Sequence, residues 1–261
     1  MNSIGQYDII KKDFTGFIHS GGASVFKINK VFEHIYVFEE PEVNSFLVIG
    51  QNQAVMIDTG CGAIDFNSEI RRITELPVFL INTHGDYDHC GGNDYFKKRY
   101  INHGDLELIR TERPDDNGEY LPLNSGDIFD LGGVELEIIA CPGHTDGSIM
   151  IYDRTNYIMF TADSACMDPL WMFGKTRNKE LFVDSMEKII KRGLKINKFL
   201  PSHGPYPLDN CEQLMAETVE AVKLDLSGST DFTVCDLDTG DRVIKVKKYV
   251  YKKAEVYTQE I

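Results

Sequence analysis

The sequence predicts an α/β protein in which stacked β-sheets are covered by helices. Short apolar strands occur in two sets along the 261 residues, and helical spacing flanks each set. Because every sheet and helix must bury an apolar face against another element, this order favours packed sheets with helices outside them. Hydrophobic residues make up 42% and charged residues 26% of the chain. That composition is typical of a globular protein and excludes disorder, collagen or coiled coil as the structure of the whole chain.

The first half of the chain predicts strands separated by tight turns. We expect residues 1–30 to be a weakly ordered lead-in with one strand near 25–28. Apolar runs bounded by Pro, Gly and Asn then predict strands at 35–38, 46–49, 54–57 and 78–81. Residues 65–73 have the apolar spacing of a helix, which ends before Pro77.

The second half predicts two hairpins, two helices and a β-ribbon tail. The hairpins pair 127–131 with 134–140 and 149–152 with 157–162. Helices are expected at 179–192 and 209–224, the second with Asp209 as N-cap, and a short strand at 198–200 lies between them. The tail predicts a ribbon over 232–257 that turns at Thr239-Gly240 and continues as a long alternating strand, 243–257. We expect one domain over 1–261, with its core at about 31–225 and its ribbon tail at 229–261.

Potential metal ligands gather in the loop after the strand at 78–81. Four of them lie within six residues, namely His84, Asp86, Asp88 and His89. Ligand-type side chains this close would repel or compete for solvent unless a divalent cation joined them, and this donor set suits zinc, iron or manganese. Three more ligand-type residues each follow a predicted strand: His144, Asp163 and His203. Since functional residues concentrate where strands lead into loops, the sequence predicts one metal site.

These motifs resemble, in order and spacing, those of the metallo-β-lactamase superfamily. The family's H-x-H-x-D-H loop corresponds to His84, Asp86, Asp88 and His89, and its later His, bridging Asp and final His correspond to His144, Asp163 and His203. Asp58, in Ile57-Asp58-Thr59-Gly60, resembles the family's strand-end acid that acts from behind the ligands. The resemblance covers about residues 45–205. It implies a four-layer αββα sandwich, to which this chain adds a C-terminal β-ribbon.

The resemblance also implies two divalent metal ions per chain. His84, Asp86 and His144 would hold the first ion, Asp88, His89 and His203 the second, and Asp163 would bridge them. Asp88 would also orient the metal-activated water that attacks the substrate. Asp86 departs from the family pattern, which has His at this position. It could therefore bind the first metal ion directly, bind it through a water molecule, or leave the first metal site weak. Zinc is the favoured metal, and the extra carboxylate makes iron or manganese the alternatives.

We therefore predict a metal-dependent hydrolase of a small-molecule ester, thioester, lactone or amide. Trp171 and Phe173, in an apolar segment after Asp163, could line a substrate pocket or pack as ordinary core; Tyr206 could reach a substrate oxygen, although simple packing is favoured for it. The alternatives are an iron-dependent redox enzyme acting on oxygen, nitric oxide or a persulfide, and a non-catalytic metal-binding module with a degraded first position. A glyoxalase-type thioesterase, an antibiotic hydrolase and an RNA nuclease are less favoured.

Charge and composition narrow the partners. A net charge of −14 argues against nucleic acid, because it repels the phosphate backbone. No apolar run is long enough to predict a membrane-spanning helix, and the N-terminus has no secretory pattern. The six cysteines stand singly, which favours reduced thiols and a cytoplasmic location. The alternating tail could serve as the pairing edge of a homodimer.

Overall fold

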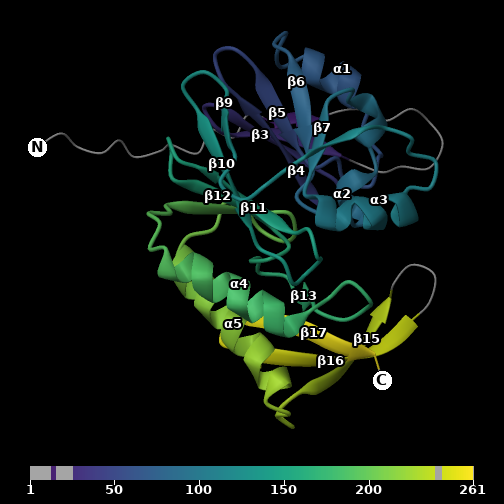
Figure 1. The fold of residues 1–261 in the computed structure, drawn as a ribbon, viewed down its shortest axis with the longest axis vertical. Helices are drawn as coiled ribbons and strands as arrows, with labels where there is room; N and C mark the ends of the chain where they lie inside the picture. Colours follow the sequence, from purple (N-terminus) through teal and green to yellow (C-terminus); the bar gives the residue numbers. More distant parts are fainter. Residues whose placement is uncertain (1–12, 16–25, 239–242, 261) are drawn as a thin grey trace, which may run out of the picture.

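Two β-sheets form the centre of the molecule, and a smaller third sheet is built around the C-terminus (Figure 1). The computed structural model describes residues 13–15, 26–238 and 243–260. The first sheet runs in chain order: β1 (Asp13–Thr15), β2 (Lys27–Phe32), β3 (Ile35–Glu39), β4 (Asn44–Ile49), β5 (Ala54–Ile57), β6 (Val78–Ile81), β7 (Arg99–Ile101) and β8 (Tyr120–Pro122). The second has the order β14 (Lys198–Pro201), β12 (Ile158–Ala162), β11 (Ile149–Asp153), β10 (Glu135–Ala140) and β9 (Ile128–Asp130).

Helices and the third sheet surround this centre. The helices are α1 (Phe66–Arg71), α2 (Tyr87–Cys90), α3 (Leu106–Glu112), α4 (Lys179–Lys191) and α5 (Cys211–Leu226), with 3₁₀ turns η1 (Asn93–Tyr95) and η2 (His103–Asp105). The third sheet has the order β13 (Leu170–Trp171), β17 (Ala254–Glu260), β16 (Val243–Tyr251) and β15 (Thr233–Asp238). Within the described residues we find no helix both long and apolar enough to cross a membrane.

Alternation along the strands separates two apolar layers. On β4, Phe46 faces the second sheet and its ring meets the Phe160 ring at 5.3 Å, centroid to centroid. Leu47, one residue on, faces the opposite side, where it joins the cluster that contains Phe66 and Ile70 of α1. This period of two is what a strand buried on both faces requires. The first sheet is therefore covered by α1 on one side and by the second sheet on the other.

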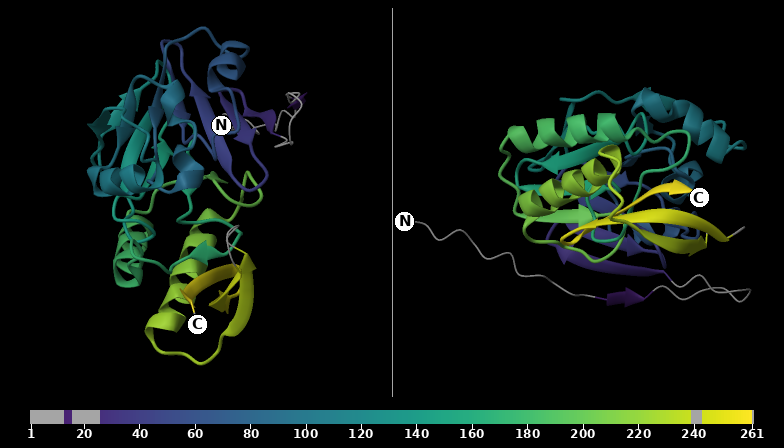
Figure 2. Two further views of the ribbon diagram at one scale, coloured as in Figure 1. Left: turned by 90° about the vertical axis from the view of Figure 1, so that its right-hand side faces the viewer. Right: turned by 90° about the horizontal axis from the view of Figure 1, so that it is seen from below.

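The second sheet is covered on its far side by α4 and α5. Ile139 and Met150 of this sheet share a buried cluster with Phe182 of α4 and Val219 of α5. Figure 2 shows α4, α5 and the third sheet at the opposite end of the molecule from α1. The layers thus follow the order helix, sheet, sheet, helix, which confirms the predicted α/β sandwich.

The C-terminal ribbon belongs to this core. Ala254 and Val256 of β17 are buried in the same cluster as α4 and α5, and β17 pairs in parallel with β13. The prediction of one long strand over 243–257 was wrong, because the chain turns at Lys252, with φ of 54°, and β17 returns antiparallel to β16. The predicted turn at 239–240 lies outside the described residues.

Two further predicted boundaries also differ from the structure. Helix α5 has Asn210 as its N-cap, with φ of 57°, instead of Asp209. The Asp209 carboxylate is engaged elsewhere, because Lys198 Nζ lies 2.6 Å from its Oδ1. The strand expected near 25–28 is β2, which continues to Phe32.

The strands that lead into the predicted ligands all run in one direction within each sheet. β5 and β6 are parallel, and β12 is parallel to β14. β10 and β12 are each antiparallel to β11, so they share a direction too.

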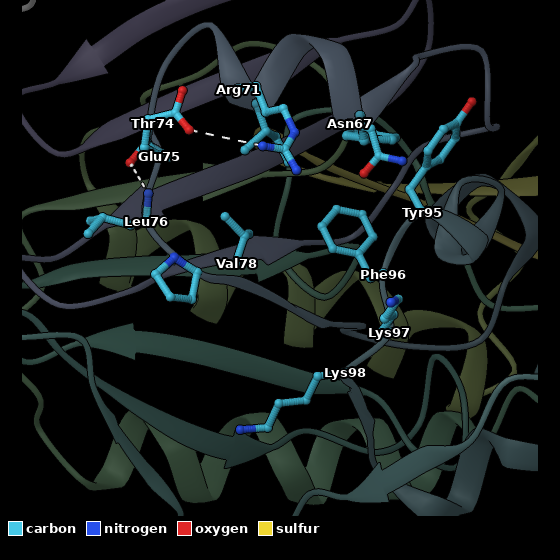
Figure 3. Close-up of a pocket in the computed structure, with 13 residues that line it drawn as sticks. Asn67, Arg71, Thr74, Glu75, Leu76, Val78, Tyr95, Phe96, Lys97 and Lys98 are labelled. Atoms are coloured by element: carbon cyan, nitrogen blue, oxygen red, sulfur yellow. Dashed lines mark hydrogen bonds and ion pairs between the residues drawn. The ribbon is translucent and has the colours of Figure 1, made fainter.

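The other end of β6 opens on a groove of about 450 Å³ that includes Arg71, Val78, Tyr95 and Lys98 (Figure 3). Since β6 starts at Val78 and enters the ligand loop after Ile81, this groove lies at the wrong end of the strand for the ligand set.

Candidate metal centre

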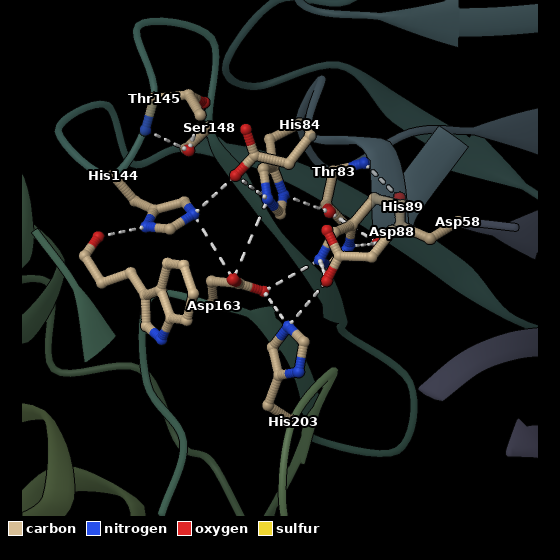
Figure 4. Close-up of polar contacts among 12 residues, drawn as sticks. Asp58, Thr83, His84, Asp88, His89, His144, Thr145, Ser148, Asp163 and His203 are labelled. Atoms are coloured by element: carbon tan, nitrogen blue, oxygen red, sulfur yellow. Dashed lines mark hydrogen bonds and ion pairs between the residues drawn. The ribbon is translucent and has the colours of Figure 1, made fainter. Parts of the chain in front are cut away.

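The structure brings all seven predicted ligands into one cluster (Figure 4). Their side-chain donor atoms form three overlapping groups, each with all atoms within 4.8 Å of one another: His84, Asp86 and His144; His84, His89 and Asp163; and Asp88, His89 and His203. The first and third groups match the two sets of three ligands that the resemblance implied. Asp86 Oδ2 lies 3.3 Å from His84 Nε2 and 3.2 Å from His144 Nε2.

Asp163 lies between these two groups, with one oxygen toward each. Its Oδ2 is 3.3 Å from His144 Nε2 and 4.0 Å from His84 Nε2. Its Oδ1 is 3.1 Å from His89 Nε2 and 3.3 Å from His203 Nε2. One carboxylate therefore faces both groups of imidazoles, which is the arrangement that a bridging ligand needs.

All four imidazoles are held by Nδ1 and turn Nε2 into the cluster. His144 Nδ1 lies 3.0 Å from the Trp171 carbonyl oxygen, and His203 Nδ1 lies 2.7 Å from the Glu42 carbonyl oxygen. A carbonyl only accepts, so both Nδ1 atoms donate, and in the neutral ring Nε2 is then the nitrogen left to bind a metal. Anchoring one ring nitrogen in this way fixes the tautomer and the orientation of a metal-binding histidine.

Asp58 anchors the other two imidazoles. Its carboxylate accepts hydrogen bonds from the Thr83 amide at 2.7 Å and the Thr83 hydroxyl at 2.6 Å, and it lies 2.9 Å from His89 Nδ1. Because the Thr83 hydroxyl gives its proton to Asp58, that hydroxyl can only accept from His84 Nδ1, 3.1 Å away. Asp58 itself has a positive φ of 59°, which is strained for a residue other than glycine. The structure thus places Asp58 behind the ligands.

Asp105 joins the two ligand loops, although no motif in the sequence points to it. The side chain is buried and accepts from the Gly85 amide at 2.9 Å, the Gly147 amide at 2.7 Å and the Thr145 hydroxyl at 2.5 Å. Gly85 neighbours His84, while Thr145 and Gly147 follow His144. A single carboxylate therefore sets the spacing between loops that lie far apart in the chain.

The cluster passes a chemical test for metal binding. His84 Nε2, His89 Nε2 and Asp163 Oδ1 are buried and form no hydrogen bond. His144 Nε2 also points into the cluster, 3.2 Å from the Asp86 carboxylate. Buried acceptors without donors are costly unless a cation satisfies them, and imidazole with carboxylate is a donor set for divalent metals.

Charges across the cluster keep its carboxylates ionised. Burial by itself would raise the pKa of Asp86, but the neighbouring imidazoles of His144 and His84, with the Arg177 charge, hold it well below its ordinary value. Burial opposes ionisation of Asp163 as well, yet the charges of His203 and His89 keep its pKa low. Burial and the Arg177 charge both lower the pKa of His144, which favours the neutral ring that metal binding requires.

The three predicted pocket residues have different surroundings. The Trp171 side chain is 38% exposed, its ring stacks on Phe173 at 5.4 Å, and it meets Tyr257 edge-on at 6.5 Å. Because the Trp171 carbonyl holds His144, this aromatic surface adjoins the ligand cluster. The Tyr206 ring instead packs edge-on against Phe46, and its hydroxyl donates to the Glu39 carboxylate.

The fold and the ligand cluster agree with the comparison to known families. Residues 39–211, more than half of the chain, match the family model described as "Metallo-beta-lactamase superfamily". The chain therefore belongs to the metallo-beta-lactamase superfamily, as its motifs predicted. Taken with the relatives below, this membership confirms the prediction of a metallo-hydrolase.

Two relatives of the chain are an acyl-coenzyme A thioesterase and a hydroxyacylglutathione hydrolase. The chain is 27% identical over 202 residues to the human "Acyl-coenzyme A thioesterase MBLAC2", covering 61% of this chain and 72% of that protein. It is 28% identical over 100 residues to a "Hydroxyacylglutathione hydrolase" of Mesorhizobium japonicum, covering 36% of each. Among solved structures, the DIM-1 metallo-beta-lactamase superposes with a TM-score of 0.65 at 18% identity, covering 77% of this chain and 98% of that one. A metallo-beta-lactamase from Pontibacter korlensis gives 0.60 at 20% identity, covering 81% and 99%.

Proposed function

We propose that this metallo-hydrolase uses two divalent metal ions to cleave the thioester of a small molecule with an apolar acyl group. The observation that carries the proposal is the convergence of four Nδ1-anchored imidazoles on the two oxygens of Asp163. Such a set offers two three-ligand groups that share one carboxylate. When bound, the metal ions supply a water of lowered pKa as nucleophile and polarise the carbonyl under attack.

The chain's own residues divide the remaining work. His84, Asp86 and His144 would hold the first ion, Asp88, His89 and His203 the second, and Asp163 would bridge them. Asp58 and the Trp171 carbonyl keep the rings in place, so that little reorganisation accompanies the reaction.

Asp88 is the residue we assign to orienting the nucleophilic water. Its Oδ2 lies 3.6 Å from His89 Nε2 and 3.4 Å from His203 Nε2, and the side chain is partly open to solvent. Burial would raise its pKa, but the charge of His89 and a hydrogen bond from His203 lower it. The carboxylate is therefore ionised at neutral pH, which is the state that can accept a hydrogen bond from the nucleophilic water.

Two features support a thioester with an apolar acyl group. The relatives named above are a thioesterase acting on acyl-coenzyme A and a hydroxyacylglutathione hydrolase, and both names describe thioester substrates. The exposed Trp171 ring, backed by Phe173 and Tyr257, gives an apolar surface beside His144. Aromatic walls with a few polar groups are typical of small-molecule sites. We assign Trp171 and Phe173 to that wall; Tyr206 stays a prediction, since its hydroxyl is bonded to Glu39.

Metal analysis joined to a substrate panel tests this proposal. The purified protein should contain two metal ions per chain, with zinc expected first. It should hydrolyse acyl-coenzyme A or S-acylglutathione faster than an ester, a lactone or a phosphodiester. His84→Ala and His89→Ala should each lose metal and turnover, whereas Arg192→Met, which removes a surface pair with Glu137, should lose neither. Retained turnover in both histidine variants, or cleavage confined to the phosphodiester, would contradict the proposal.

The same measurements separate the alternatives. Iron with a visible absorption spectrum and no thioester turnover would favour the redox enzyme, and absence of tight metal binding would favour a degraded site. Three other expectations stay predictions: a single domain over 1–261, a cytoplasmic location, and a homodimer through the ribbon.

A further inference from the structure

Arg177 is a cation beside the first ligand group. It lies in the loop between β13 and α4, directly before the N-cap Asn178, and its side chain is only 12% exposed. Its Nη1 donates to Asp86 Oδ1 at 3.2 Å, and its Nη2 donates to Asp86 Oδ2. Nη2 also lies 3.3 Å from His144 Nε2. Among the residues that the structure describes, no other Lys or Arg forms an ion pair with a carboxylate of the ligand set.

The charges of Arg177 and Asp86 cancel. Asp86 stands where the superfamily pattern has a neutral imidazole, so it adds one negative charge to the first group. A guanidinium stays protonated in proteins, and its planar fork matches both oxygens of a carboxylate. A buried carboxylate with this partner avoids the cost of an unpaired charge. Together, Asp86 and Arg177 carry the same net charge as the imidazole they replace.

We propose that Asp86 and Arg177 act as one neutral ligand unit, in which Asp86 binds the first metal ion and Arg177 sets the affinity of that position. Arg177 repels a cation and competes with it for Asp86 Oδ2, so the first position binds metal less tightly than a bare carboxylate would allow. Arg177 is thus a positioning residue that acts through Asp86. The inference rests on the two-metal centre proposed above.

A set of four chains separates these charges. Wild type, Arg177→Met, Asp86→His and the double variant Asp86→His/Arg177→Met give the pair net charges of 0, −1, +1 and 0. Each is stripped of metal and titrated with Zn²⁺ against a chromogenic chelator. The titrations are run in a His203→Ala background. Because the second group then lacks one of its ligands, the titration reports Zn²⁺ binding to the first group.

The charges predict an order of affinities. Arg177→Met should bind Zn²⁺ at least about tenfold more tightly than the parent, and Asp86→His at least about tenfold more weakly, because charges a few ångströms apart interact strongly even at an effective dielectric constant of 20. The double variant should return to within about threefold of the parent, since its charge is restored. Arg192→Met, which breaks an exposed pair with Glu137, is the matched control and should change nothing.

Stability of the metal-free protein gives a second readout. Arg177→Met should lower the melting temperature of the apoprotein, because Asp86 is left buried without its cation, and Zn²⁺ should raise that temperature by more than in the parent. Arg177→Lys keeps the charge and loses the fork, so its Zn²⁺ affinity should stay near that of the parent. Far-ultraviolet circular dichroism checks folding, and Arg177→Gln replaces any Met variant that does not fold.

The two proposals fail in different ways. If the wild-type protein binds no Zn²⁺, the proposed metal centre itself is contradicted. A wild-type protein that binds Zn²⁺, together with an Arg177→Met affinity that is equal or weaker, would overturn the role of Arg177 and leave the metal centre standing.

Discussion

Replacing Asp105 by Asn should loosen both ligand loops at once. The Asp105 carboxylate accepts from Gly85 and Thr145 on Oδ2 and from Gly147 on Oδ1. An amide can keep its oxygen toward only one side, so its NH₂ group would face the Gly147 N–H, and two donors would meet. Losing one charge-assisted hydrogen bond and leaving one buried donor unpaired should together lower the free energy of unfolding by about 3 kcal/mol. For a chain of this size that is a fall of about 6–12 °C in melting temperature.

The metal should respond as well as the fold. Residues that hold ligands in place typically change metal affinity by about 10–100-fold when they are altered, and we expect a loss of that size for Asp105→Asn. Thermal unfolding of the metal-free protein and Zn²⁺ competition titrations measure the two effects. Asp130→Asn is the control, because Asp130 also accepts from a backbone amide, Gly132 at 2.8 Å, but on the exposed surface. An Asp105→Asn protein with unchanged stability and unchanged Zn²⁺ affinity would refute the reasoning.

Three further predictions concern pH, substrate and assembly. Burial raises the pKa of Glu40 to about 7, above the ordinary 4.5 of a glutamate, and its Oε1 has no hydrogen-bond partner. The native state therefore binds more protons than the unfolded chain between these values, and Glu40 reduces stability as the pH rises through 7. Glu40→Gln should accordingly match the stability of the parent near pH 4.5 and exceed its free energy of unfolding by roughly 1–2 kcal/mol near pH 8. This gain is smaller than the full pKa difference would give, because the carboxyl keeps some contact with solvent. Denaturant unfolding of the apoprotein at both pH values measures the gain, and a difference that does not change with pH would contradict it. Trp171→Ala should lower kcat/KM for long acyl thioesters more than for acetyl thioesters and leave the metal content unchanged, and an equal loss for both chain lengths would argue against an apolar wall. If the ribbon pairs two chains, Val234→Lys at the exposed face of edge strand β15 should convert a dimer to a monomer in sedimentation velocity, and an unaltered dimer would place the interface elsewhere.

Local patterns were enough to predict most of the fold. Strands β3, β4, β5 and β6 lie where short apolar runs predicted them, and α1 and α4 lie where helical spacing did. The predicted ligands also come together, because each follows a strand and those strands share a direction within their sheets. The errors concern features that local spacing does not encode. The tail was predicted as one long strand because alternation continues through Lys252, where the backbone turns.

Residues that hold or tune the cluster could not be found from the sequence. Arg177 and Asp86 are 91 residues apart, and Asp105 and Thr145 are 40 residues apart. Nothing in the neighbourhood of an isolated Arg or Asp predicts which distant carboxylate or amide it will meet. The same holds for the Trp171 carbonyl, which orients His144 from a strand that the C-terminal β17 holds in place.

The strand pattern, the seven candidate ligands and the superfamily could be predicted from the residues alone, because burial and ligand chemistry leave periodic and closely spaced signals. The packing of the layers was needed to see how the imidazoles are anchored, which cation pairs with Asp86 and that the ribbon is part of the core. These features depend on contacts between segments far apart in the chain. Such contacts form only when the layers pack, so no local pattern of residues records them.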